Sequence, residues 1–153
     1  MFTIVYEEDF NYSKTSQNIY STFFVKCNDI EFPDREWLDF PFAVLKMWCE
    51  KVLTEVIEVQ NSEFSLYFMD GPFYIYCIKN DTEINMQFIN NRKNKIIQNE
   101  VVISTDEFIR EIIKVSSKLI YQMKDLRIQS INDIDSLKGL IHQLKRKIRK
   151  FKE

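Results

Sequence analysis

The stretch "EFSLYFMDGPFYIYCIKNDTEINMQFINNRKNKIIQNEVVIS", residues 63–104, decides the fold of this chain of 153 residues. Asp70-Gly71 is a hairpin signal, because both residue types tolerate the positive φ that a tight turn demands. Pro72 then opens the returning segment, where a missing N–H is acceptable. The stretch predicts a meander of four antiparallel strands. Their expected ranges are 63–69, 73–79, 83–89 and 96–104.

The chain before the meander predicts two more strands and a helix. Segments 2–6 and 19–27 are rich in β-branched and aromatic residues, which is typical of strands. A helix is predicted over residues 40–58, because Asp39 can cap its first turn. Pro41 falls in that turn, where no N–H is needed. The helix is apolar on most of its girth, which predicts that it is covered on more than one side.

After the meander, two more helices are predicted. Ser104 and Glu107 form a capping box that opens a long amphipathic helix, and a last helix follows a polar break. The expected fold class is α+β, with the order ββαββββα, an antiparallel meander packed on two helices, and an additional C-terminal helix. We expect a single domain over residues 1–130 and a basic helical appendage over 131–153.

Aromatic residues and a turn are the predicted structural anchors of this fold. Trp37, Phe40 and Trp48 surround the start of the first helix and are expected to fix it to the sheet. Gly71 and Pro72 are expected to shape the hairpin. Their role is architectural.

Glycine, histidine and cysteine usage excludes several kinds of chemistry. The only glycines are Gly71 and Gly139, so no glycine-rich loop can bring backbone amides close to a phosphate. The only histidine, His142, lies on the basic last helix without a residue to orient it. The three cysteines are widely spaced in apolar runs, which indicates reduced core thiols. We therefore expect no metal and no cofactor.

Carboxylates remain as candidates for catalysis. Asp34, Glu36, Asp39 and Asp70 lie near aromatic residues, and an apolar environment could raise the pKa of a carboxyl group for general acid work. The structural interpretation is simpler, because Asp39 suits a helix cap and Asp70 a turn. We therefore predict that the protein is not an enzyme. A small enzyme with a carboxylate general acid or base is an alternative.

The charge layout favours a protein partner. Residues 1–70 carry 5 basic and 13 acidic side chains, a net charge of −8, whereas residues 131–153 have a net charge of +4. An acidic surface attracts basic proteins and repels nucleic acid, so no nucleic-acid partner is predicted. We assign the expected binding surface to Asp34, Glu36, Asp39, Phe42 and Asp70.

No membrane association is predicted, because no apolar run approaches the ~20 residues needed to span a bilayer. The N-terminal segment turns acidic where a signal peptide would be basic, so we expect a cytoplasmic location.

The last helix carries an apolar seam with alternating spacings of three and four residues. A parallel homodimer through this seam would set Lys147 of one copy against Lys152 of the other, which is repulsive. We therefore predict that the seam packs on its own domain or on an acidic partner. The alternative hypothesis is that the protein self-associates through this seam as a structural or adaptor protein. The seam consists of Ile134, Leu137, Ile141, Leu144, Ile148 and Phe151.

Two motifs, "FPDREWLDF" with the later Trp48 and "FMDGPFYI", resemble those of a group of small, uncharacterised bacterial proteins. The group is associated with the immunity proteins that accompany polymorphic toxins. The resemblance covers about residues 32–74 and implies no catalytic residue. It implies a non-enzymatic protein that neutralises a cognate toxin through its acidic surface. The matching residues are Phe32, Pro33, Trp37, Asp39, Phe40, Trp48, Phe68, Asp70, Gly71 and Pro72.

Overall fold

The predicted meander forms a four-stranded antiparallel sheet in the computed structural model, which describes residues 1–12, 19–69, 71–126 and 131–152. The strands pair in chain order, with one register shift between Phe88 and Ile89. β6 and β9 are the two edges of the sheet. The strands are β6 (Asn61–Tyr67), β7 (Phe73–Asn80), β8 (Glu83–Asn90) and β9 (Ile96–Ser104).

The N-terminal strands form a second antiparallel sheet built around one long strand. The other four strands all pair with β3 and do not join the meander. Three of them have only two or three residues, too few to show the alternation that identifies a strand in a sequence. The strands are β1 (Phe2–Tyr6), β2 (Asn11–Tyr12), β3 (Ile19–Cys27), β4 (Ile30–Phe32) and β5 (Leu38–Asp39).

The first predicted helix is present and changes its winding near its end. α1 (Pro41–Lys51) begins with proline in its first turn, as predicted, and continues into one π-helical turn, η1 (Val52–Val56). The amide of Ile57 donates to the carbonyl of Val52, five residues back, at 2.9 Å. The helical path ends at Ile57, which is extended with φ −77 and ψ 132, and Glu58 follows with φ +67.

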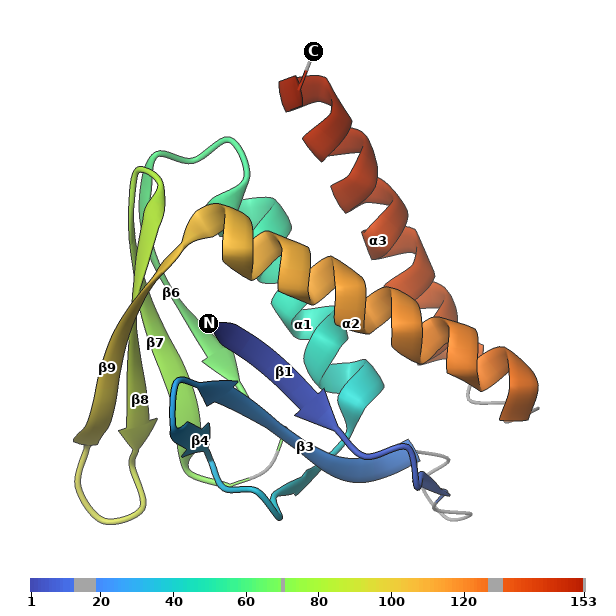
Figure 1. Ribbon diagram of the computed structural model, residues 1–153, viewed down its shortest axis with the longest axis horizontal. Helices are drawn as coiled ribbons and strands as arrows, with labels where there is room; N and C mark the ends of the chain where they lie inside the picture. Colours follow the sequence, from blue (N-terminus) through green and yellow to red (C-terminus); the bar gives the residue numbers. More distant parts are fainter. Residues whose placement is uncertain (13–18, 70, 127–130, 153) are drawn as a thin grey trace.

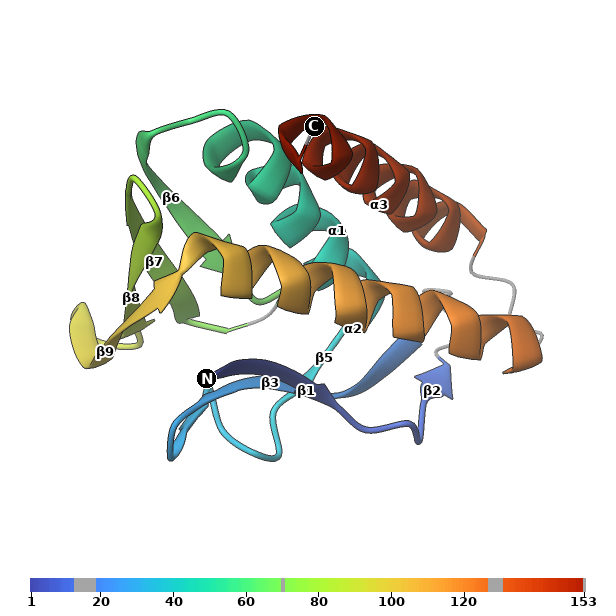
Figure 2. The same ribbon diagram turned by 45° about the horizontal axis from the view of Figure 1, so that its top comes forward.

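Two long helices complete the α+β fold. α2 (Thr105–Leu126) begins where the capping box predicts it, and the hydroxyl of Ser104 accepts from the amide of Glu107 at 3.0 Å. α3 is the last helix (Ile131–Lys152). Figures 1 and 2 show all three helices on the same side of the meander, with α3 lying across α1 and α2.

Aromatic side chains hold the two sheets and α1 together. The ring of Phe32, on β4, stacks on Phe88 of the meander with centroids 4.9 Å apart. Trp48 of α1 is fully buried and meets Phe23 and Phe68 edge to face, at 5.8 and 5.5 Å. Both sheets and the helices therefore share one core.

The seam of α3 packs on the protein's own helices. Leu137, Ile141 and Leu144 are buried in the common core, and Ile134 and Ile148 are partly buried against it. The side chain of Phe151 lies outside the described residues. Of the two predicted alternatives, packing on its own domain or on an acidic partner, this structure has the first. Among the described residues no ion pair holds α3, so apolar contact fixes it.

The exposed edge of β1 is closed by two carboxylates of α2. The amide of Phe2 donates to Glu107 at 2.6 Å, and the amide of Ile4 donates to Glu111 at 2.9 Å. Glu107 and Glu111 are four residues apart and so lie on one face of the helix. A strand edge with paired donors is a poor template for another chain.

Candidate protein-binding surface

The predicted binding residues do not form one surface. Asp34 and Glu36 are exposed in the turn after β4, where the amide of Glu36 donates to Asp34 at 2.8 Å. Phe42 was expected to face outward, but it is buried with 3% exposure. It is buried because α1 is covered by sheets on one side and by α2 and α3 on the other. Asp70 lies outside the described residues.

Asp39 has a structural role different from the predicted helix cap. The residue that caps α1 is Phe40, which makes no side-chain cap hydrogen bond. The Asp39 carboxylate is 2% exposed and accepts from Trp37 Nε1 at 2.9 Å, from the Phe40 amide at 2.8 Å and from the Met69 amide at 3.2 Å. It therefore ties β5 to the end of β6, and burial removes it from any binding surface.

The predicted anchors are architectural, as the sequence indicates. Gly71 has φ +82, and a Cβ at this position would lie 2.7 Å from Cη2 of Trp37. The Trp37 ring also meets Phe73 edge to face at 5.2 Å. Trp48 donates from Nε1 to the carbonyl of Tyr67 at 2.9 Å, which fixes α1 to β6.

The remaining two anchors lie nearer the surface. Phe40 is partly buried and meets Tyr20 edge to face at 6.4 Å. The carbonyl of Pro72 accepts from the amide of Asn91 at 3.0 Å, which ties the β6–β7 connection to the start of the β8–β9 turn.

The three thiols are buried and separate, as predicted. Burial raises the pKa of Cys49 to about 12 despite its 3.9 Å contact with Ser116 Oγ, and burial also raises the pKa values of Cys27 and Cys77. A protonated thiol is a poor nucleophile and metal ligand. In the part of the chain that the structure describes, no three His, Cys, Asp or Glu side chains gather to hold a metal.

Lys79 is the one buried lysine among the described residues, and its surroundings are structural. Its Nζ donates to the carbonyls of Val59, Gln60 and Asp81 at 2.5, 3.0 and 2.6 Å. Burial lowers the pKa of this ammonium group, while the charge of Asp81 opposes the shift. The three carbonyls satisfy its three donors, so Lys79 fixes the connection into β6 to the β7–β8 turn.

Strand pairing defines the surface of the meander that points away from the core. Phe64, Ile75, Met86 and their alternating neighbours face the helices. The residues between them form cross-strand rows on the other side. One row is Tyr67, Tyr74, Ile89 and Ile97; the next is Ser65, Tyr76, Gln87 and Glu100; a third is Glu63, Ile78, Asn85 and Val102.

We call this surface the open face, because Figures 1 and 2 show no helix on it. Tyr67 on one edge strand is 52% exposed, and Ile97 and Val102 on the other are 49% and 58% exposed, so large apolar side chains meet solvent at both edges of this face. Tyr67 and Tyr74 are in ring contact, with centroids 5.4 Å apart. The open face comprises the accessible aromatic and aliphatic residues Tyr67, Tyr74, Tyr76, Ile78, Ile97 and Val102, with Glu63, Glu83 and Glu100, whereas Ile89 in its first row is fully buried.

The open face is acidic. Glu63, Glu83 and Glu100 are all exposed on it. The hydroxyl of Tyr76 donates to Glu63 at 2.6 Å, and this hydrogen bond raises the pKa of Tyr76. Lys95 Nζ lies 5.7 Å from the centre of the Tyr76 ring and offsets part of the negative charge.

The sequence contained part of the signal for this surface. Alternation in β6–β8 separates two faces, and both faces carry aromatic or aliphatic residues. Apolar residues on both faces of a sheet predict that both faces are buried. Only the placement of the helices shows which side is left uncovered.

Comparison with known proteins gives no relative: no family model, no curated protein and no solved structure matches the chain. Within the described residues, no helix combines the length and apolar character needed to cross a bilayer.

Proposed function

We propose that this protein is a non-enzymatic binding module that holds a basic protein against the open face of its meander. The observation that supports this most directly is a sheet surface with three tyrosines and three aliphatic residues on which no helix or strand of the described chain lies.

The composition of the open face suits protein recognition. Tyrosine is enriched at protein interfaces, because its ring buries a large area and its hydroxyl remains able to hydrogen bond. Tyr67 and Tyr74 support each other by ring contact, so little side-chain freedom is lost on binding. A four-stranded sheet is also a rigid platform.

Charge indicates the kind of partner. The open face carries three exposed glutamates against one nearby lysine. The net charge of −8 over residues 1–70 adds a longer-range attraction for a positively charged protein. The resemblance of residues 32–74 to immunity proteins makes a basic toxin the leading partner, and a bound immunity protein would neutralise it.

The test is direct binding to the protein encoded by the neighbouring gene, together with protection of cells that express it. We expect the double variant Tyr67→Ala/Val102→Ala to bind at least about tenfold more weakly and to lose protection. Tyr121→Ala is the matched control, because Tyr121 is 68% exposed on α2 and lies off the open face. Full binding by the double variant, or absence of binding and protection with the natural chain, would contradict the proposal.

The charge argument has a separate readout. Glu83→Gln/Glu100→Gln removes two negative charges from the open face and leaves its apolar residues in place. We expect slower association at low salt and a weaker dependence of the rate on salt concentration, with dissociation little changed. An unchanged salt dependence would argue against electrostatic steering by this face.

A further inference from the structure

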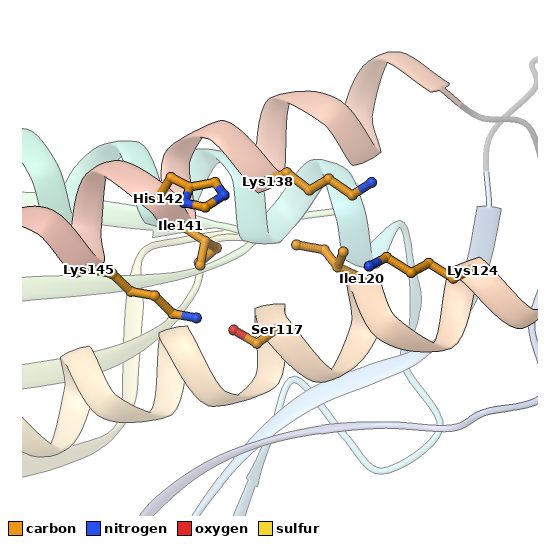
Figure 3. Close-up of a pocket in the computed structure, with 7 residues that line it drawn as sticks. All are labelled: Ser117, Ile120, Lys124, Lys138, Ile141, His142 and Lys145. Atoms are coloured by element: carbon orange, nitrogen blue, oxygen red, sulfur yellow. The ribbon is translucent and has the colours of Figure 1, made fainter.

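A cleft with a different chemistry lies between α2 and α3 (Figure 3). Its volume is about 270 Å³. One isoleucine from each helix, Ile120 and Ile141, forms its apolar wall, and the remaining side chains are polar. It is formed by the same helix pair that the α3 seam holds together, so its walls are fixed by the core.

The polar side chains of the cleft are basic. Lys124 projects from α2, and Lys138 and Lys145 project from α3 beside His142. Among the described residues, no carboxylate lines the cleft and none of the three lysines has an ion-pair partner. By contrast Lys118, on another face of α2, lies 3.6 Å from Glu8.

A buried hydroxyl in the same cleft also has no partner. Ser117 Oγ is inaccessible to solvent and makes no hydrogen bond with the described residues. A buried polar atom without a partner is unfavourable, and such an atom in a native protein calls for an explanation. Figure 3 shows this oxygen directed toward the cleft on the side of Lys145, while Lys124 and Lys138 reach toward the other end. The isoleucines lie between the two ends.

We propose that this cleft binds a small molecule that carries phosphate groups. Three ammonium groups and the Ser117 hydroxyl offer hydrogen-bond donors, and a phosphate group offers the most acceptor oxygens and negative charge in a small volume. Lys145 contacts one phosphate, which the Ser117 hydroxyl reaches by rotating out of its buried position, and Lys124 and Lys138 contact another negative group. This site is independent of the open face and adds a ligand to the proposed protein-binding function.

The test uses pyrophosphate as the probe in isothermal titration calorimetry, with ionic strength held constant. We expect saturable binding at one site, and at least about tenfold weaker binding by Lys138→Gln/Lys145→Gln. Lys26→Gln/Lys93→Gln is the control, because it removes two exposed lysines away from the cleft, one on β3 and one in the β8–β9 turn, and changes the net charge equally. The absence of saturable binding, or an equal loss in both double variants, would overturn the proposal.

Ser117→Ala distinguishes a specific phosphate contact from general attraction to the lysines, since it removes the hydroxyl and leaves the net charge unchanged. We expect severalfold weaker pyrophosphate binding with no loss of thermal stability, because the hydroxyl has no partner to lose. Unchanged affinity would remove Ser117 from the site and contradict the proposed contact. Equal affinity for citrate, a carboxylate polyanion, would overturn the assignment to phosphate.

The phosphate could belong to a soluble molecule or to a lipid headgroup. Co-sedimentation with phosphatidylcholine vesicles that contain phosphatidic acid, reversed by pyrophosphate, would assign the headgroup. Pyrophosphate binding without vesicle binding would assign a soluble ligand. Because these experiments need no protein partner, they can fail or succeed independently of the open face.

Discussion

At the scale of single residues, the two glycines of the chain are expected to respond in opposite ways to replacement by alanine. Gly71→Ala would force a side chain into a backbone with φ +82 and place its Cβ 2.7 Å from the Trp37 ring. That ring is held by Asp39 and by Phe73, so it cannot move aside freely. We expect the free energy of unfolding to fall by roughly 2 kcal/mol, measured by urea denaturation.

Gly139→Ala is the matched control for the same chemical change. Gly139 lies within α3, and a Cβ there would meet no atom within 4 Å. Alanine is the better helix former, so we expect the free energy of unfolding to rise by about 0.5–1 kcal/mol. Equal effects at the two positions would contradict the steric argument for Gly71.

Asp39 shows what a sequence does not reveal at this scale. An aspartate just before a helix predicts an N-cap, because that inference uses only neighbouring residues. In the structure its carboxylate accepts from Met69, thirty residues away, and from the indole of Trp37. The choice among these donors depends on β5 and β6 meeting, and no local pattern encodes that meeting.

At the scale of elements, long periodic segments are predictable and short ones are not. The four meander strands lie within two residues of their predicted ends, because alternation and turn residues define them locally. β2, β4 and β5 exist because β3 offers them backbone partners. The sequence likewise predicts an ordinary α-helix where η1 has its π-helical turn, since α- and π-helical segments have similar composition.

The seam of α3 gives a prediction for one element. Leu144 is fully buried, and its helix packs on α1 and α2. We expect Leu144→Ala to lower the free energy of unfolding by about 3 kcal/mol, because it leaves a cavity in the core. Gln143→Ala changes an exposed neighbour on the same helix and is expected to stay within about 0.5 kcal/mol of the natural chain.

Protein concentration distinguishes this packing from self-association. A seam buried within one chain gives a thermal midpoint for unfolding that does not change with concentration. A seam shared between chains gives a midpoint that rises with concentration. A midpoint that rises with concentration, with the rise abolished by Leu144→Ala, would favour the self-associating adaptor over packing within one chain.

At the scale of the whole molecule, the sequence predicts an acidic binding protein, but the fold does not gather the residues assigned to its binding surface. The net charge of −8 over residues 1–70 does not correspond to one surface, because folding separates the acids. Asp39 is buried, whereas Asp34 and Glu36 lie on a separate turn. The open face gathers Glu83 and Glu100 from later strands. Surface composition depends on which side the helices cover, and that is a property of the assembled fold.

Alkaline pH tests the assembled fold, because Tyr6, the last residue of β1, reaches α2 and donates its hydroxyl to Gln122. Burial, with a smaller contribution from Glu8, raises the pKa of Tyr6 to about 12 from an ordinary 10.0. The folded state therefore favours the neutral phenol, so this contribution to stability is complete below pH 10 and is lost as pH rises toward 12. We expect the urea midpoint to fall less steeply between pH 9.5 and pH 11.5 in Tyr6→Phe than in the natural chain.

The comparison must use slopes, because Tyr6→Phe also removes the 2.5 Å hydrogen bond to Gln122 at every pH below the titration. Tyr121→Phe, which removes an exposed hydroxyl from α2, is the control. Parallel pH profiles for the natural chain and Tyr6→Phe would show that this phenol ionises as readily in the folded state as in the unfolded chain.

The pairing of β1 with α2 has a consequence for how the molecule is made. β1 is synthesised before α2, and the acceptors of its outer amides, Glu107 and Glu111, follow it by more than a hundred residues. Until they emerge, water must hydrate those amides, and any passing extended peptide can compete for them. The hydrogen bonding of β1 is therefore complete only after α2 has been synthesised.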